Sequence, residues 1–386
     1  MTLPPPQGPY GSQPSGGGGP QWGGPPPQGP GPQPQYGQPG APWAQQPQWG
    51  APPPNKGGKG KWILVGLALV AIIAVSIVGT VLVLRPDSSG TSGDTSNTAS
   101  EFASAKDTGP ANIITEDPTC DAWRKVSNEL TVVSDAVKWN ELDYSVPAAE
   151  WTPEQRAAFE KESAALTDVI PSVANLAKQT PHRVMRELYG QVNAYAQAVV
   201  DAIPTYSSTD NQIVAASNKM FGALNRVCDA IYFRAAQQTA PLIAAPSPPS
   251  VPQAPNEDGE QIPERFLNNS TAGCSDWIDL VEWFDKDKDS IAWGDLDANV
   301  KAAEWTPEHK AVMDAVAPVL SRYADDMEHV GRDSGNPIWE DFAIFAAQYM
   351  RAYVQGIPTY TPNSVYMSLT SNTLSNGIYW ACKAAS

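Results

Sequence analysis

Apolar residues recur every three or four positions in two long segments of the chain, residues 118–236 and residues 272–386. This spacing places them on one face of a helix, with polar residues on the other face. In the first segment the apolar stripes fall in four stretches, 123–137, 166–176, 184–199 and 213–231. The second segment repeats the later stripes, from Ile338 to Tyr353 and from Met367 to Ile378. The pattern predicts an all-α fold with four helices in each segment.

One further stretch, residues 62–84, is apolar throughout and contains no charged residue. As a helix it would be about 34 Å long, enough to cross a hydrocarbon core of about 30 Å. A cleaved signal peptide would have a shorter apolar region close to the terminus. Three lysines precede the run, at positions 56, 59 and 61, whereas a single arginine, Arg85, follows it. Because positive charge beside a membrane-spanning helix stays in the cytoplasm, we expect a single-pass plasma-membrane protein with a cytoplasmic N-terminus and an extracytoplasmic C-terminal domain.

The segments on either side of this run have compositions that disfavour folding. Residues 1–61 are rich in proline, glycine and glutamine, and they predict a disordered cytoplasmic tail with polyproline character. Regularly spaced aromatic residues leave open whether this tail is a spacer or a docking segment for protein partners. Residues 85–117 are rich in serine, threonine and glycine, and they predict a flexible stalk.

The two helical segments are copies of one another. A shift of the chain by 154 residues superposes Cys120 on Cys274 and Cys228 on Cys382. The same shift aligns two identical blocks, AAEWTPE and IPTY, with their second copies. This internal duplication predicts two tandem modules of one fold, residues 118–236 and 272–386. The proline-rich residues 237–271 between them predict an extended spacer and therefore two separate domains.

All four cysteines lie in the predicted modules. Their even number favours disulfide bonds over a zinc site, since the sequence has no C-x-x-C motif and no nearby histidine pair. Four cysteines allow three pairings. In an up-down-up-down bundle the start of the first helix and the end of the fourth lie at the same end. This geometry selects Cys120 with Cys228 and Cys274 with Cys382, one clasp in each four-helix-type bundle.

The formal net charge of the chain is −16. Binding to nucleic acid requires basic patches, so this charge argues against a nucleic-acid partner. Asp285, Asp287 and Asp289 begin like a calcium loop, but Ser290 and Leu296 stand where such a loop requires glycine and glutamate. We therefore expect a solvated helix end there, and we predict neither a metal site nor a cofactor.

Two kinds of residue recur in both copies and could carry function. The recurring carboxylates, Asp143 with Asp297 and Glu150 with Glu304, could serve acid–base chemistry, but helix capping and loop hydrogen bonding explain them without any catalysis. The recurring aromatic residues predict a possible ligand patch, because aromatic faces beside carboxylates bind sugars, cationic ligands or protein hot spots. Its members are Trp139, Trp151, Tyr206, Trp293, Trp305 and Tyr360. The alternative is that these rings pack the inter-helix loops onto the bundle, which needs no ligand.

The tail sequences QPQYGQPG and QPQWGAPPP, one predicted membrane span, a Ser/Thr-rich stalk and a cysteine-clasped domain together give the chain its layout. This layout resembles the proline-rich single-pass membrane proteins of mycobacteria and related actinobacteria. The resemblance covers layout and tail composition, and it implies a cell-envelope context without any site residues.

We expect a membrane-anchored, non-enzymatic binding or scaffolding protein of the cell envelope. Its tail and its helical modules would bind protein partners, and a glycan or lipid ligand remains open. One alternative is an envelope enzyme that uses the repeated carboxylates. The other is an accessory subunit of a larger membrane complex.

Overall fold

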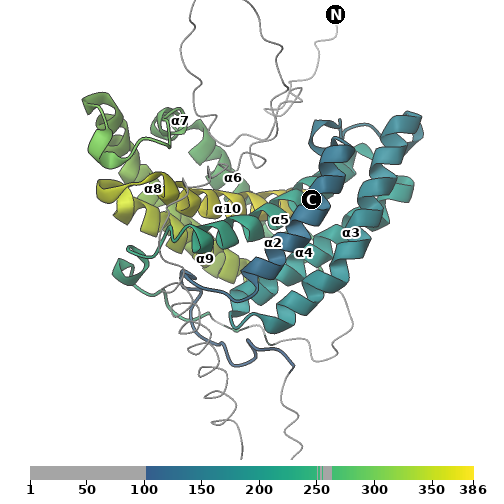
Figure 1. Ribbon diagram of the computed structural model, residues 1–386, viewed down its shortest axis with the longest axis horizontal. Coiled ribbons are helices and arrows are strands. Elements are labelled where there is room, and N and C mark those ends of the chain that lie inside the picture. Colours follow the sequence, from purple (N-terminus) through teal and green to yellow (C-terminus); the bar gives the residue numbers. More distant parts are fainter. Residues whose placement is uncertain (1–100, 250, 253, 255–262) are drawn as a thin grey trace, which may run out of the picture. The chain divides into compact units, whose positions relative to one another are not determined.

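The computed structural model describes residues 101–249, 251, 252, 254 and 263–386 (Figure 1). This described part of the chain contains nine α-helices and several short 3-10 helices, and it has no strand. The predicted all-α fold is therefore confirmed for these residues. The first copy of the duplication, called repeat 1 from here on, contains α2 (Cys120–Ala136), α3 (Pro153–Gln179), α4 (Arg183–Ala202) and α5 (Asn211–Tyr232).

Repeat 2, the second copy, places its helices in the same order. They are α6 (Ala272–Lys286), α7 (Lys288–Gly294), α8 (Pro307–Asp333), α9 (Pro337–Gly356) and α10 (Val365–Ala384). Under the shift of 154 residues, α8 and α9 have the same bounds as α3 and α4. The 3-10 helices are Trp139–Glu141, Ala148–Glu150, Ile203–Thr205, Ser208–Asp210, Ala240–Leu242, Ala302–Glu304, Ile357–Thr359 and Pro362–Ser364.

Capping residues explain where the helices begin. The Thr152 side chain accepts a hydrogen bond from the Gln155 backbone, the Gln155 side chain accepts one from the Thr152 backbone, and Pro153 follows at the first helical position. In repeat 2 the Asp287 carboxylate accepts hydrogen bonds from the backbone N–H groups of Asp289 and Ser290, which starts α7 directly after α6 ends. Repeat 2 therefore has two helices where repeat 1 has one, a break that the apolar pattern does not predict.

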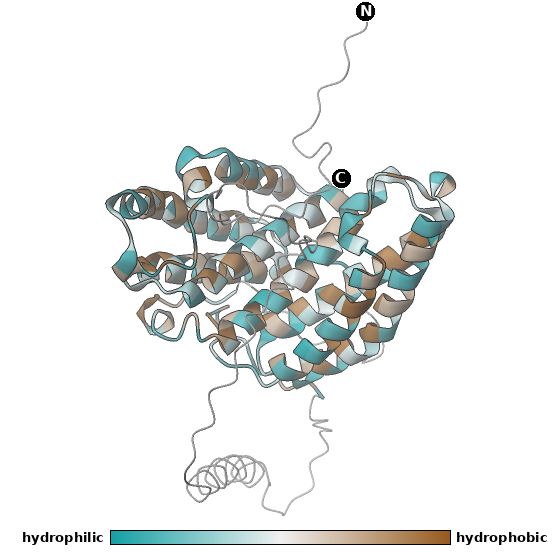
Figure 2. Ribbon diagram, turned by 45° about the horizontal axis from the view of Figure 1, so that its top comes forward, coloured by the Kyte–Doolittle hydropathy of each residue, from teal (hydrophilic) through white to brown (hydrophobic). Residues whose placement is uncertain are grey.

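The two repeats pack against each other and share a hydrophobic core (Figure 1). Helix α4 contacts its equivalent α9, and α5 contacts its equivalent α10 along most of its length. Hydropathy colouring shows apolar and polar residues on the same helices, as expected of amphipathic helices (Figure 2). Contact between equivalent helices is the pattern of an isologous dimer interface, here formed within one chain.

Glycines allow α5 and α10 to approach closely. A Cβ atom at Gly222 would lie 3.2 Å from Cγ2 of Thr373, and one at Gly377 would lie 3.1 Å from Cε of Met220. All described residues belong to one compact unit. Apolar stripes of both repeats meet in the shared core, and a second apolar cluster lies within repeat 1. The segment boundaries drawn from the sequence remain predictions.

Residues 101–117, which we name the N-terminal strap, pack on both repeats. Ala111 and Ile114 are buried in the shared core. The Ile114 carbonyl accepts a hydrogen bond from the Tyr349 hydroxyl of repeat 2 at 3.0 Å. In repeat 1 the backbone N–H of Arg183 donates to the Asp107 carboxylate at 2.6 Å. The flexible stalk expected at 85–117 is therefore wrong for the strap, because its few apolar residues enter the core.

The described ends of the predicted spacer also pack on the repeats. Phe266 is buried, and its backbone N–H donates to the Gln191 side chain of α4 at 2.9 Å. The Phe266 carbonyl accepts a hydrogen bond from Asn336, the residue that precedes α9, at 2.6 Å. Phe266 thus contacts both repeats, and this end of the spacer joins them.

Among the described residues, no helix is both long enough and apolar enough to cross a membrane. This finding contradicts the predicted single-pass plasma-membrane localisation. The apolar run at 62–84, on which that prediction was based, and the tail at 1–61 lie outside the described residues.

Candidate functional site

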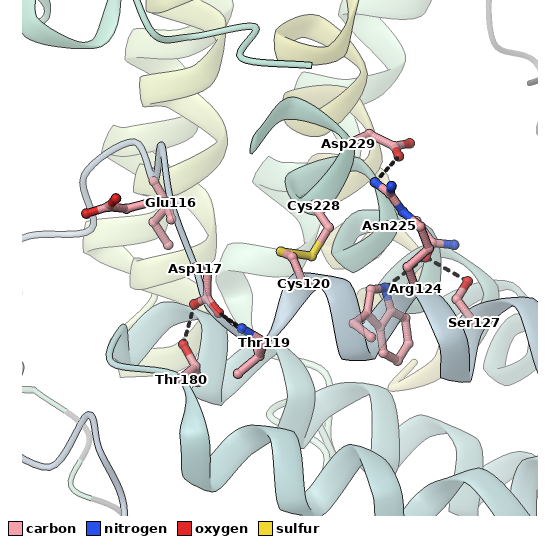
Figure 3. The surroundings of a disulfide bond; sticks show 12 residues. Glu116, Asp117, Thr119, Cys120, Arg124, Ser127, Thr180, Asn225, Cys228 and Asp229 are labelled. Carbon is pink, nitrogen blue, oxygen red and sulfur yellow. Dashed lines mark hydrogen bonds and ion pairs between the residues drawn. A yellow bond between two sulfur atoms is a disulfide. The ribbon is translucent and has the colours of Figure 1, made fainter. Parts of the chain in front are cut away.

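Both predicted disulfides are present, Cys120 with Cys228 and Cys274 with Cys382. Each joins the beginning of the first helix of a repeat to its last helix. Beside the first disulfide, the Asp117 carboxylate accepts hydrogen bonds from the Thr119 backbone at 2.8 Å and the Thr180 hydroxyl at 2.5 Å (Figure 3). Because Thr180 precedes α4, Asp117 ties the end of the strap to repeat 1 next to the disulfide.

The six aromatic residues of the predicted ligand patch lie inside their own repeats. Five of them are buried, and Trp305 is half-buried. In repeat 1 the Trp151 indole donates to the Val146 carbonyl at 2.9 Å, and the Tyr206 hydroxyl donates to the Tyr144 carbonyl at 2.9 Å. The first hydrogen bond lies within the loop between α2 and α3, and the second joins that loop to the loop between α4 and α5.

Repeat 2 makes the same two contacts at the equivalent positions. The Trp305 indole donates to the Val300 carbonyl, and the Tyr360 hydroxyl donates to the Ala298 carbonyl, both at 2.9 Å. Loop packing therefore accounts for the recurrence of these rings. The burial gives the ligand-patch hypothesis, with its glycan or lipid ligand, no support.

The remaining pair of the predicted patch makes different contacts in the two repeats. The Trp139 indole donates to the Asn218 side chain at 3.4 Å. The Trp293 indole donates to the Tyr353 hydroxyl at 2.9 Å. Both indoles thus donate to a helix of their own repeat.

The recurring carboxylates stabilise turns. Hydrogen bonds from the side chain and the backbone of Ser145 lower the pKa of the Asp143 carboxyl. Asp297 accepts a hydrogen bond from the Asn299 backbone at 2.9 Å in the same manner. Glu150 and Glu304 are exposed. The contacts of Asp143 and Asp297 are loop hydrogen bonds and do not favour acid–base catalysis.

The acidic residues that resemble a calcium loop act as a helix cap, since Asp287 accepts the backbone hydrogen bonds that start α7. Within the described ranges, no group of three or more histidine, cysteine, aspartate or glutamate side chains is arranged to hold a metal ion.

Buried charges gather where α4 meets α9. Arg183 of α4 forms a bidentate ion pair with Asp341 of α9, with Nε and Nη2 each 2.8 Å from a carboxylate oxygen. These side chains are 2% and 0% exposed. The third guanidinium nitrogen, Nη1, donates to the strap carbonyls of Asp107 and Gly109, at 3.0 and 2.9 Å. One side chain thus connects both repeats and the strap.

Glu187 and Asp341 occupy equivalent positions, because the shift of 154 residues superposes them. The buried Glu187 carboxyl lies 3.7 Å from Arg183 Nε and 3.7 Å from Arg186 Nη2. Burial raises the pKa of Glu187 well above its ordinary value, and the neighbouring Asp341 carboxylate raises it further. We name Arg183, Arg186, Glu187 and Asp341 the interface charge cluster.

The interface charge cluster is buried, so its chemistry is structural. A buried ion pair contributes little net stability, but removal of one partner is costly, and such pairs can specify one arrangement of helices. The apolar pattern does not reveal this cluster, because its members lie within or beside stretches that the pattern marks as apolar stripes. A signal was available, since Glu187 and Asp341 align under the same shift as the cysteines.

Three comparisons relate the chain to known proteins. The family model of the mycobacterial ESX-1 associated protein matches residues 102–386, from the start of the strap to the C-terminus. An uncharacterized protein of Mycolicibacterium smegmatis (strain MKD8) is 37% identical over 333 residues, which cover 84% of this chain and 86% of that protein. No solved structure matches the chain. Since the family model covers nearly all of the described residues, the chain belongs to the family of mycobacterial ESX-1 associated proteins.

Proposed function

We propose that this chain is a non-enzymatic accessory protein that works with ESX-1, a mycobacterial secretion system, by binding other proteins. The observation that carries this proposal is the family match over residues 102–386. This match favours an accessory subunit over an independent enzyme, because the family is named for its association with ESX-1.

The architecture fits such a role. We regard the molecule as two disulfide-clasped helical modules that are fixed against each other by the shared core and by the interface charge cluster. A rigid body of this kind presents long helices at fixed positions, and helix surfaces and the grooves between them are common binding sites for protein partners.

Co-purification tests the proposal. The full chain, tagged and produced at its native level in a mycobacterium, is expected to co-purify with ESX-1 components. A strain that lacks ESX-1 is the control, and deletion of the gene for this chain is expected to reduce ESX-1-dependent secretion. Absence of ESX-1 components above the control, together with unchanged secretion in the deletion strain, would contradict the proposal.

A further inference from the structure

A groove runs between α6 and α8 of repeat 2. It has a volume of about 280 Å³. Its floor is apolar, with Leu280 buried and Trp283 and Val330 half-buried. The guanidinium carbon of Arg322 lies 4.4 Å from the centre of the Trp283 ring. This contact shows that the ring can stack with a cationic side chain, as tryptophan often does.

Carboxylates line the groove. Asp276 and Asp279 are exposed on α6, and Asp326 faces them from α8. Arg322 bonds to Asp326 at 3.2 Å. Within the part of the chain that the structure describes, Asp276 and Asp279 take part in no ion pair, unlike the nearby Glu282, which pairs with Lys286. Asp276 and Asp279 therefore form no ion pair with a described residue, since Arg322, which lines the same groove, pairs with Asp326.

Repeat 1 provides an internal comparison, because the equivalent positions follow from the duplication. Ala122 and Lys125 stand where repeat 2 has Asp276 and Asp279, and Glu129 stands in place of Trp283. The aromatic floor and the α6 carboxylates thus belong to repeat 2 alone. Packing contacts that both repeats share therefore do not explain the presence of Trp283 and of the α6 carboxylates.

We propose that the groove between α6 and α8 docks a basic amphipathic helix of a partner protein. The inference deepens the proposed accessory role and rests on it for the existence of a protein partner. An apolar groove between two helices accepts the apolar face of a third helix. Lysine or arginine residues beside that face meet Asp276 and Asp279, and the formal charge of −16 steers a basic partner toward the chain.

A binding experiment with two model peptides tests the proposal. The probes are fluorescent amphipathic helices of the same length as α6, one with arginines and one with glutamates beside a leucine face. The full chain is expected to bind the arginine peptide and not the glutamate peptide. The double variant Asp276→Asn/Asp279→Asn is expected to weaken this binding about twofold to thirtyfold, the range for two exposed charge pairs. Trp283→Ala is expected to weaken it by about tenfold, since aromatic anchors dominate such contacts.

The matched control is Glu129→Gln/Asp168→Asn, which removes two exposed charges from the equivalent surface of repeat 1. It is expected to leave the affinity unchanged. An equal loss in both double variants would show non-specific attraction to an acidic protein and overturn the proposal. Failure of the arginine peptide to bind, or a dimer of the full chain that Trp283→Ala dissociates, would overturn it as well.

The two proposals can fail separately. If ESX-1 components co-purify equally well with the full chain and with Trp283→Ala, the accessory role stands and the groove is not the docking site. If the arginine peptide binds as expected but ESX-1 components do not co-purify, the groove inference stands with a partner outside ESX-1.

Discussion

Glu162 is a buried carboxyl group in the aromatic cluster of repeat 1, between α2 and α3. The Ser134 hydroxyl donates to its two oxygens, at 2.8 and 3.1 Å. Burial raises the pKa of Glu162 to about 7, and the hydrogen bond from Ser134 opposes part of this rise. The titratable Tyr144 and Tyr206 belong to the same cluster, and repeat 2 has Val316 at the equivalent position.

Glu162→Gln is expected to make stability less dependent on pH. The folded pKa of about 7 exceeds the ordinary value of 4.5, so Glu162 favours the folded state at low pH. That contribution is lost as the pH rises through 7, and it amounts to about 3 kcal/mol. The variant is therefore expected to match the original chain at pH 4 and to exceed its free energy of unfolding by about 3 kcal/mol at pH 8. Urea unfolding between these pH values measures the difference.

Glu160→Gln is the control for this prediction, because Glu160 lies exposed on the same helix. It removes the same charge without removing a buried one, and its stability is expected to follow the original chain at every pH. Equal pH profiles for Glu162→Gln and the original chain would show that Glu162 does not titrate in this range.

Substitution of the equivalent acids Asp341 and Glu187 is expected to change the free energy of unfolding to different extents. Asp341→Asn leaves the buried Arg183 guanidinium without its carboxylate and should lower the free energy of unfolding by about 3–5 kcal/mol. Glu187→Gln removes an acid whose raised pKa disfavours its charged form, so no loss is expected at pH 7. Chemical denaturation of the two variants at pH 7 checks the contrast, and equal losses would refute it.

At the scale of elements, the strap is expected to be part of the folded unit. A chain that begins at residue 118 lacks the buried Ala111 and Ile114 and the Asp117 contacts. Its Tm is expected to lie about 10 °C below that of a chain that begins at residue 101, given roughly 2–4 °C per kcal/mol at this size. Thermal unfolding followed by circular dichroism measures the difference. Equal Tm values would show that the strap is dispensable.

The helices were predictable from the sequence, whereas the packing of the strap and of the spacer ends was not. The apolar period and the block at Thr152 predict α3, its start and its counterpart α8, because helix periodicity and capping are local properties. The strap and the spacer ends escaped prediction because each is short, has few apolar residues and shows no helical apolar period. Their packing depends on single residues such as Ile114 and Phe266, which enter a core that other segments build.

At the scale of the whole molecule, unfolding is expected to be one cooperative transition. The two repeats share a core, and Phe266 and Arg183 contact both of them. Calorimetry of the described region is expected to give one peak whose calorimetric enthalpy equals its van't Hoff enthalpy. Two resolved peaks would instead mean that the repeats unfold independently.

The disulfide pairing was also predictable, because it follows from bundle geometry and from the duplication. The interface charge cluster was not predictable. The apolar period shows which face of each helix is buried, but it does not show which helices of the two repeats pack against each other. Recurring aromatics such as Trp151 suggested a binding patch, but duplication preserves packing residues as well as functional ones. Recurrence alone therefore cannot separate these roles.

Contact between equivalent helices has a consequence for valency. A dimer of two identical subunits carries every surface site twice, and it separates on dilution. Fusion of the two halves into one polypeptide prevents separation and lets each half diverge, so Trp283 appears on one half while Glu129 stands on the other. The described residues thus have the geometry of a dimer but offer a single α6–α8 groove of this chemistry, which would recruit one partner helix without cross-linking two.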